Sequence, residues 1–417
     1  MTKYKSILRK VNDFFKTHTL IFIYTLVLLL LLYGTFKTSG TKYSGLLAIY
    51  VFTLIISYII FVKAKLKNYL VRIYKRITIP LSYQTLNYIS YFVFFSTIVF
   101  IIYHLSILGG SPQIKAFSFT NVDDIANLRR GITEFAPTGI KYLSSFIVKG
   151  FLPFLILYFF IKKKYVFYYI ILFIAAFYVF SLMQKSYIAT ILIPVFIFSL
   201  LQKKYIYSLK HILIIIIVIF TMSFSANPEI KDDFIAGLHE EKTEDNQGKA
   251  SSYNSFQKIY LGLKNRVLII PGQLVAEWFY MIPDKKPFLY GNGYRLVAKI
   301  KGEEYINYPR EFAIHLRPEH IERGLTPNLN TASFMYDYAN FGKLGLFISG
   351  IALSLLFIFI ESIFLNNFTY KFCLNFSFIL FISSTALTTT LLSGGWGIII
   401  FLFILFKPQL KTENIKI

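Results

Sequence analysis

Long apolar stretches recur along almost the whole chain, and they limit what it can fold into. A helix needs roughly 20 mainly apolar residues to cross the hydrocarbon of a bilayer. We identify ten stretches of about this length, at about 18–36, 43–62, 84–107, 138–161, 165–183, 187–202, 208–225, 334–364, 370–391 and 394–408. Hydrophobic residues make up 55% of the chain and charged residues 16%, so one soluble core could not bury the apolar surface. We therefore predict an all-α polytopic membrane protein with about ten transmembrane helices.

The charges between these stretches predict the orientation. The chain has 44 Lys and Arg against 21 Asp and Glu, a formal charge of +23. Basic residues collect at the N-terminus, in every second connection (Lys162 to Lys164, for example) and in the C-terminal tail. The positive-inside rule then places both termini of a multi-pass membrane protein in the cytoplasm. Because the basic residues flank spans, they do not indicate a nucleic-acid partner.

Two further features narrow the class of protein. The basic N-terminus runs into a full-length apolar stretch without a small-residue cleavage site, so we expect no cleavable signal peptide. The chain has one cysteine, Cys373, which excludes an internal disulfide and a cysteine-based metal site.

Between the seventh and eighth stretches lies a long polar segment. We divide the chain into residues 1–225 with helices one to seven, an external loop at 226–333, and residues 334–417 with helices eight to ten and a cytoplasmic tail. The loop carries 14 basic and 14 acidic residues, and a loop this long in a compact protein is usually functional or disordered. We expect catalytic elements in it.

Two helices are predicted within this loop. An apolar stripe from Phe256 to Ile270 predicts a helix that lies along the outer membrane surface and ends at Pro271-Gly272. Pro318 to Arg323 predicts a short helix that begins with proline and precedes a glycine.

Charges inside or beside membrane spans are functional candidates, since they cost several kcal/mol unless they are paired or hydrated. Lys149 lies near the middle of the fourth stretch, Lys185 lies in the turn before the sixth, and Arg129-Arg130 precede the fourth. The alternative for Lys149 is a structural ion pair with Asp337 or Glu361, and the alternative for Lys185 is an ordinary interfacial anchor.

A second basic cluster lies in the loop just before the eighth stretch. Its members are Arg310, His315, Arg317, His320 and Arg323, which suggest an external anion site because arginine binds phosphate bidentately. The alternative is a solvated surface neutralised by Glu311, Glu319 and Glu322.

Metal and nucleotide chemistry are disfavoured. The spacing of His315 and His320 across Pro318 does not place both rings on one helical face. Asp123 and Asp124 are adjacent and do not face one point on a helix. No glycine-rich phosphate loop occurs in the short cytoplasmic connections, so we expect no cofactor and no use of ATP or sugar nucleotides.

Four segments resemble one family. They are Leu263–Gln273, Phe288–Gly293, Thr326–Gly345 with its Asn340-Phe-Gly step, and the Gln184-Lys185-Ser186 turn. Together with the large external loop late in the chain they resemble the Wzy-type oligosaccharide repeat-unit polymerases, which build O-antigens and capsules. Some members carry paired arginines with a glycine at fixed spacing, which Arg129 followed by Gly139 only approximates.

The resemblance implies an integral-membrane glycosyltransferase with a fold similar to the GT-C-like enzymes. It would join two polyprenyl-pyrophosphate-linked oligosaccharides at the outer face of the plasma membrane, with a chain-length-regulating co-polymerase as a further partner. No nucleotide is needed, because the donor carries its own pyrophosphate leaving group. Fixed arginines and lysines would stabilise the charge that develops on departure, and a histidine would accept the proton of the acceptor hydroxyl.

Site residues are assigned on this basis. Pyrophosphate and sugar binding is assigned to Arg129, Arg130, Lys149, Lys185, Arg266, Arg310, Arg317, Arg323, Asn328, Asn330 and Tyr336. His315 is the first candidate for the base, His320 the second, and Asp337 a carboxylate alternative. Trp278, Tyr280 and Tyr336 are candidates to stack on sugar rings.

Two other functions remain open. An O-antigen ligase would use the same chemistry with lipid A core as the acceptor. A polysaccharide flippase or other transporter would usually show internal repeats and polar midplane residues without one large external loop. The chain shows no such repeat, which favours an enzyme.

The predicted topology can be tested by reporter fusions. Fusions after residues 115 and 250 should report outside, and fusions after residues 70, 163, 204 and 417 should report inside, because the basic connections stay in the cytoplasm. An inside signal at residue 250 would place the large loop in the cytoplasm and remove the argument for an external active site.

Overall fold

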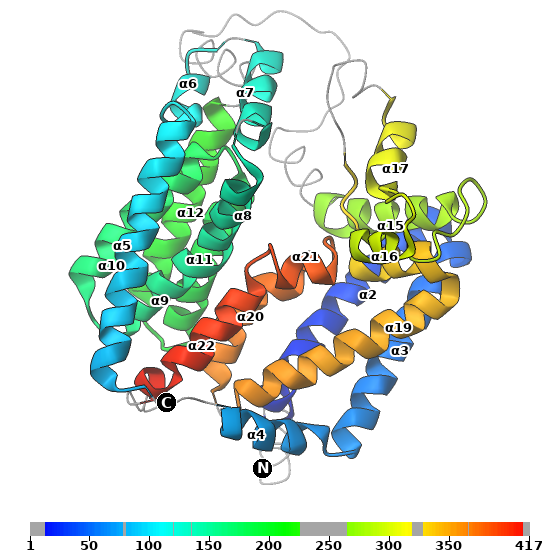
Figure 1. The fold of residues 1–417 in the computed structure, drawn as a ribbon, viewed down its shortest axis with the longest axis horizontal. Helices are drawn as coiled ribbons and strands as arrows, with labels where there is room; N and C mark the ends of the chain where they lie inside the picture. The colour runs from blue at the N-terminus through cyan, green and yellow to red at the C-terminus, as the bar shows by residue number, and fades with distance from the viewer. Residues whose placement is uncertain are drawn as a thin grey trace, which may run out of the picture. The chain divides into compact units, whose positions relative to one another are not determined.

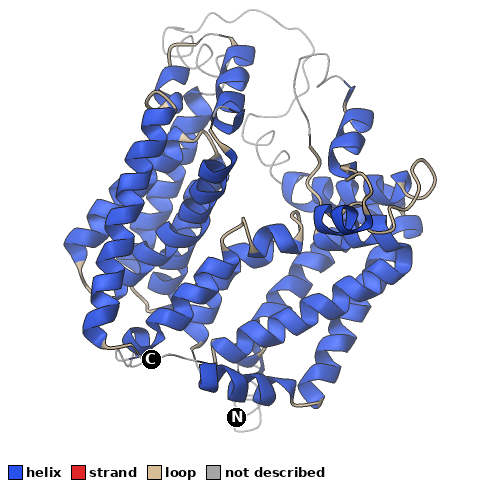
Figure 2. Ribbon diagram, viewed as in Figure 1, coloured by secondary structure: helices blue, strands red, loops and turns tan. Residues whose placement is uncertain are grey.

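The computed structural model describes residues 13–77, 81–119, 121–134, 136–225, 265–318, 328–365 and 367–411. Within these ranges the secondary structure is helical and contains no strand (Figure 2). Residues 226–264 and 319–327 lie outside them, and with them most of the predicted surface helix from Phe256 and of the short helix at Pro318–Arg323.

Six helices of the described residues are long and apolar enough to cross a membrane. They are Thr19–Ser39, Thr41–Lys63, Tyr83–Ala116, Thr138–Ile161, Tyr205–Met222 and Ser333–Ile363. Four shorter apolar helices lie at Tyr165–Ser181, Lys185–Leu201, Phe368–Phe381 and Trp396–Lys407. This architecture agrees with an α-helical membrane protein.

The outward faces of the long helices are apolar. On α5 (Tyr83–Ile107), Phe92, Phe95, Val99 and Ile102 form one stripe and are between 57% and 72% exposed. A helix on the surface of a soluble protein carries polar residues on its exposed face. The stripe on α5 instead matches an environment of lipid chains.

The described chain forms two compact units. Unit 1 comprises the described residues of Met1–Ile77, Ala250–Phe368 and Phe378–Thr390. Unit 2 comprises those of Thr78–Lys249, Thr369–Ser377 and Leu391–Ile417. Residues far apart in sequence therefore build each unit, and the loop residues from 265 onward belong with the first two membrane helices.

Unit 1 is built on three long helices. They are α2 (Thr19–Ser39), α3 (Thr41–Lys63) and α19 (Ser333–Ile363), and α4 (Leu66–Ile77) packs on α19. The loop contributes η2 (Asn265–Ile269), α15 (Ile270–Met281), α16 (Arg295–Lys301) and α17 (Tyr308–Leu316). Figure 1 shows α15, α16 and α17 together at one end of the long helices, with α4 near the other end.

The contact between α15 and α2 corrects one prediction. Pro271-Gly272 does not end a helix: the π-helical turn η2 leads into α15, and Pro271 lies in the first turn of α15, where its missing N–H costs nothing. Gly272 instead allows the two backbones to touch, since a Cβ there would lie 2.3 Å from the carbonyl carbon of Gly34. The Thr35 hydroxyl donates to the Gly272 carbonyl at 3.1 Å across the same crossing.

Two predicted spans are interrupted. The eighth runs over Ser333–Ile363 as predicted but bends sharply at Gly342, whose backbone angles (φ 61°, ψ −141°) are not helical. The ninth is not continuous over 370–391: α20 ends at Phe381, and the short helix α21 (Leu387–Leu391) follows after a break. The apolar runs continue through both positions and did not reveal either break, because hydropathy carries no information about backbone angles.

Unit 2 is a bundle of apolar helices. It contains α5, α6 (Pro112–Ala116), α7 (Val122–Glu134), α8 (Thr138–Phe146), η1 (Ile147–Phe151), α9 (Leu152–Ile161), α10 (Tyr165–Ser181), α11 (Lys185–Leu201), α12 (Tyr205–Ser225) and α22 (Trp396–Lys411). Every residue of α9 is buried, so this helix is the core of the bundle (Figure 1). The predicted short turn before the sixth span is confirmed, and Lys185 is the first residue of α11.

The Gly34–Gly272 crossing predicts a specific loss of stability. Gly272→Ala should lower the free energy of unfolding by about 1–3 kcal/mol, the usual range for overpacking, because the new methyl group would overlap the α2 backbone. Gly45→Ala in α3 is the matched control, since a Cβ at Gly45 meets no atom within 4 Å. Thermal unfolding of the purified protein in detergent measures both, and equal melting temperatures for the two variants would contradict this packing.

Candidate functional site

A polar cavity in unit 2 is the first candidate site. Its volume is about 170 Å³, and it is lined by His104, Ile132, Lys141, Ser144, Ser145, Leu182, Gln184 and Tyr187. These residues come from α5, α7, α8 and the region where α10 turns into α11. Below, this space is called the unit 2 cavity.

Lys149 lies in a local change of helix type, near a lining residue of this cavity. The fourth predicted span is α-helical on both sides but passes through the π-helical turn η1 at Ile147–Phe151. Such turns are rare overall, but they occur often at functional sites. The Lys149 Nζ atom lies 5.8 Å from the ring centroid of Tyr187, which lines the cavity.

The other basic residues predicted for this part of the chain lie on elements that line the same cavity. Arg129 is exposed on α7, close enough for its charge to act on the Tyr187 hydroxyl. Arg130 follows it and is half-buried. Lys185 is exposed and directly follows Gln184, a lining residue. Lys141, which was not predicted as a site residue, lines the cavity itself.

A buried histidine in the wall of the cavity was not predicted as a site residue. His104 is 2% exposed, and its Nδ1 atom is 2.7 Å from the Tyr178 hydroxyl. The Tyr178 hydroxyl is also 2.7 Å from the Ser144 hydroxyl. Among the described residues the His104 Nε2 atom has no hydrogen-bond partner. A buried polar atom without a partner requires an explanation, and a bound ligand or water in the cavity would supply one.

These features fit an anionic ligand. Lys141 lines the cavity, and Lys149 and Arg129 lie near Tyr187 in its wall, while none of the eight lining residues is acidic. Ser144, Ser145 and Gln184 add polar groups, although the Ser145 hydroxyl already donates to the Ser393 carbonyl at 2.7 Å. Cations held in place around a cavity without acids attract phosphate-type anions.

In unit 1 the predicted loop residues occupy separate positions. Arg310 and His315 lie on α17 and are exposed, and Asn328 and Asn330 are exposed as well. Arg317 follows α17, and its guanidinium lies 3.4 Å from the carboxylate of Glu277. Glu277 was not predicted as a site residue. The Glu277 carboxylate also accepts a hydrogen bond of 2.8 Å from Gln273. Arg317 is therefore ion-paired rather than open to a ligand.

Asp337, the alternative base, lies in the first part of α19 and is a hydrogen-bond acceptor. The Tyr294 hydroxyl donates to its carboxylate. Burial, together with the charge of Asp337, raises the pKa of Tyr294 well above the ordinary value of a phenol. Tyr294 also stacks on Phe341, so Asp337 ties the loop residue to α19.

The Asn340-Phe-Gly step has a structural role. The Asn340 side chain is fully buried, and its Oδ1 atom accepts hydrogen bonds from the backbone N–H groups of Gly291 and Gly293 at 3.1 and 3.0 Å. Its Nδ2 atom donates to the Tyr336 carbonyl at 2.8 Å. Two of the segments that carry the family resemblance therefore meet, and Asn340 fastens the Gly291–Gly293 turn onto α19.

The remaining predicted residues fall into three groups. His320 and Arg323 lie outside the described residues, and so does the side chain of Arg266, whose backbone belongs to η2. Tyr336 is half-buried in α19. Trp278 cannot stack on a sugar ring as expected, because it is fully buried and its indole N–H donates to the Met335 carbonyl at 2.8 Å. In the described residues, no three His, Cys, Asp or Glu side chains gather closely enough to hold a metal ion.

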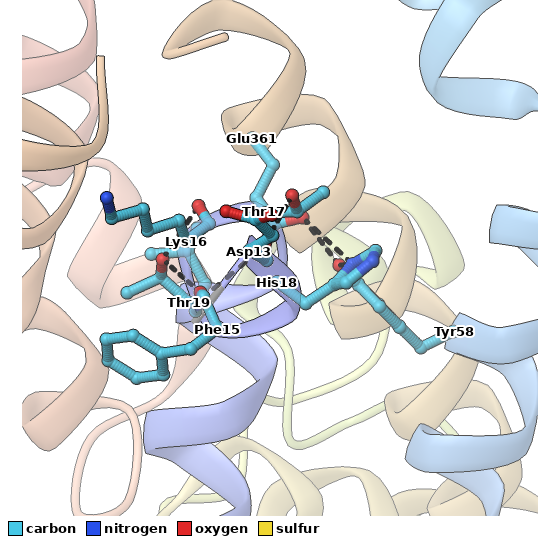
Figure 3. Close-up of polar contacts among 9 residues, drawn as sticks. Asp13, Phe15, Lys16, Thr17, His18, Thr19, Tyr58 and Glu361 are labelled. Carbon is cyan, nitrogen blue, oxygen red and sulfur yellow. Dashed lines mark hydrogen bonds and ion pairs between the residues drawn. The ribbon is translucent and has the colours of Figure 1, made fainter. Parts of the chain in front are cut away.

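A second buried carboxylate lies in the last turn of α19. Glu361 accepts hydrogen bonds from the Tyr58 hydroxyl and from the backbone N–H of Leu20, at 3.3 Å for the latter (Figure 3). The Nδ1 atom of His18 is 4.0 Å from Glu361 and 2.8 Å from the Tyr58 hydroxyl. Burial lowers the pKa of Lys67 on α4, and the charge of Glu361 acts in the opposite direction. This cluster joins α2, α3 and α19, which gives Glu361 a structural role.

Comparison with protein-family models, with curated proteins and with solved structures finds no match to this chain. The functional conclusion therefore depends on the sequence and on the geometry above.

The Glu361 cluster predicts a loss of stability on removal of one hydroxyl. Tyr58→Phe should lower the free energy of unfolding by about 1–3 kcal/mol, because a buried carboxylate oxygen would lose its hydrogen bond. Tyr33→Phe makes the same chemical change on α2 at a side chain that is 47% exposed, and it should change stability by less than about 0.5 kcal/mol. Chemical or thermal unfolding in detergent would disprove the structural role of the cluster if both variants behaved alike.

Proposed function

We propose that this chain is a membrane-embedded glycosyltransferase that polymerises polyprenyl-pyrophosphate-linked oligosaccharide repeat units into O-antigen or capsular polysaccharide. The reaction would take place at the outer face of the bacterial plasma membrane. The proposal includes ten membrane spans, with the four shorter apolar helices completing the set, and a GT-C-like arrangement.

The observation that carries the proposal is the unit 2 cavity. Its nearby cations are Lys141, Lys149 and Arg129, and the His104 Nε2 atom, which has no partner within the part of the chain that the structure describes, offers a further polar contact. In the predicted topology Arg129, Lys141 and His104 lie toward the outer face, where the pyrophosphate of an outer-leaflet lipid would be found, and Lys149 lies deeper, near the middle of the fourth span. A soluble nucleotide donor would instead need a site in the cytoplasmic connections.

The chemistry follows from the charge that the reaction develops. A hydroxyl oxygen of the acceptor sugar attacks the anomeric carbon of the donor and forms the new C–O bond. The bond from that carbon to the pyrophosphate oxygen breaks, and the polyprenyl pyrophosphate leaves with the electron pair. Lysine and arginine side chains that are already in place stabilise the growing negative charge without reorganisation.

The hydroxyl proton requires a base. We assign His315 first, since it is exposed on α17 and imidazole is the side chain that most often serves as a general base. His320 remains the second candidate. Asp337 is a weaker one, because its carboxylate already accepts the Tyr294 hydroxyl.

The proposal predicts that polymer formation depends on Lys149. Lys149→Met keeps an apolar side chain of similar length but removes the charge, and it should lower turnover by about 10²–10³-fold, the range seen when one group that stabilises a developing anion is removed. The measurement uses purified protein in proteoliposomes with lipid-linked repeat units, and gel electrophoresis of the products shows the ladder of chain lengths.

The control is Lys210→Met, which removes one exposed lysine from α12 in the same unit and should leave the ladder unchanged. A normal ladder from Lys149→Met would overturn the role of the cavity. A wild-type protein that transferred the glycan only to lipid A core would instead be a ligase. One that moved lipid-linked units across the bilayer without forming a glycosidic bond would be a transporter.

A further inference from the structure

Unit 1 contains a polar recess that differs in charge from the unit 2 cavity. It has a volume of about 360 Å³, and it is lined mainly by Thr38, Ser39, Tyr43, Gln273, Glu277 and Tyr280. This volume lies at the lower end of the range of about 300–1,000 Å³ that is usual for small-molecule sites. The space is called the Glu277 recess here.

The polar groups of the recess are held in place before any ligand arrives. Gln273, Glu277 and Tyr280 lie on successive turns of one face of α15. The backbone contact of Gly272 with Gly34 fixes this helix against α2, which supplies the opposite wall. The Thr38 and Ser39 hydroxyls donate to backbone carbonyls of α2, at 2.9 and 2.8 Å, so that their lone pairs remain available to a ligand.

Charged groups of both signs meet at the recess. Glu277, whose side chain is 18% exposed, is its one charged lining residue, and Arg317 lies 3.4 Å from its carboxylate. At the edge, the Nζ atoms of Lys285 and Lys42 lie 5.8 and 4.9 Å from the ring centroids of Tyr280 and Tyr43. The lining itself thus presents a carboxylate, the Gln273 amide and hydroxyl groups.

Such a set matches a hydroxyl-rich, uncharged ligand. A carboxylate accepts hydrogen bonds from sugar hydroxyls, and charge-assisted hydrogen bonds of this kind are about twice as strong as neutral ones. Tyr280 is 42% exposed and offers an aromatic surface to the apolar face of a sugar ring.

We propose that the Glu277 recess is a carbohydrate-binding site that holds a saccharide of the lipid-linked substrate. The identity of that saccharide depends on the function proposed above, whereas the capacity to bind a sugar does not. Glu277 binds the sugar hydroxyls, Gln273 and Arg317 orient its carboxylate, and Tyr280 contacts the ring.

The test measures binding of the repeat-unit oligosaccharide after mild acid has released it from its lipid pyrophosphate. Saturation-transfer NMR on the full-length protein in nanodiscs gives the dissociation constant. Glu277→Gln should weaken binding by at least about tenfold, because a hydrogen bond to a charged group is replaced by a neutral one. Tyr280→Ala should weaken it as well, and it leaves the Glu277–Arg317 pair intact, so a folding defect in the first variant does not remove the test.

The matched control is Glu311→Gln. Glu311 is another loop carboxylate in an ion pair, 2.9 Å from Lys286, but it is 39% exposed and does not line the recess. Its substitution should leave the dissociation constant within about twofold of the wild-type value, as expected for a surface ion pair.

The outcomes separate this inference from the proposed function. Wild-type protein that fails to bind the oligosaccharide, or Glu277→Gln and Tyr280→Ala variants that bind it normally, would overturn the carbohydrate site even if polymer is made. Binding that is lost in these two variants and kept in Glu311→Gln would establish the site even if the purified protein forms no polymer.

Discussion

Lipid chains offer no hydrogen bonds, and this constraint explains most of the polar contacts inside the helices. A polar side chain within such a helix must find a partner in the protein, on its own helix or on another, or lose several kcal/mol. Accordingly, the Tyr24 and Tyr50 hydroxyls are 3.1 Å apart, the Trp396 indole donates to Asn375 at 2.7 Å, and Tyr168 and His211 are 2.6 Å apart. Each pair joins separate parts of the chain, so the requirement for hydrogen bonds also fixes the packing.

Departures from this rule are informative. Glu361 has two hydrogen-bond donors and a nearby histidine, so its charge is accounted for within the fold. His104 uses one ring nitrogen inside the bundle and leaves the other without a partner among the described residues. Both side chains are almost fully buried, yet only His104 lines a cavity that basic side chains surround. His104, with one ring nitrogen that lacks a partner among the described residues, is for this reason a better indicator of a ligand site than Glu361.

The sequence predicted the membrane helices well and their interruptions poorly. Continuous apolar runs located α2 and α3 to within a few residues. The π-turn at Lys149 and the bend at Gly342 depend on backbone angles that hydropathy does not encode. Glu277 was missed because its partner Arg317 is forty residues away, although the spacing of Gln273, Glu277 and Tyr280 on one helical face was visible in the sequence.

The unit 2 cavity and the Glu277 recess differ in the charge of their lining residues, and this difference matches the ligand proposed for each. A pyrophosphate leaving group gains negative charge during the reaction, so its site benefits from fixed cations without acids, as around the unit 2 cavity. A sugar stays neutral, and unbalanced charge beside it would only attract competing ions. The Glu277 recess meets that need by pairing its carboxylate with Arg317, which keeps strong hydrogen-bonding atoms while cancelling their net charge. A single site with both properties would be a compromise, because cations that bind phosphate would also occupy the carboxylate that binds the sugar.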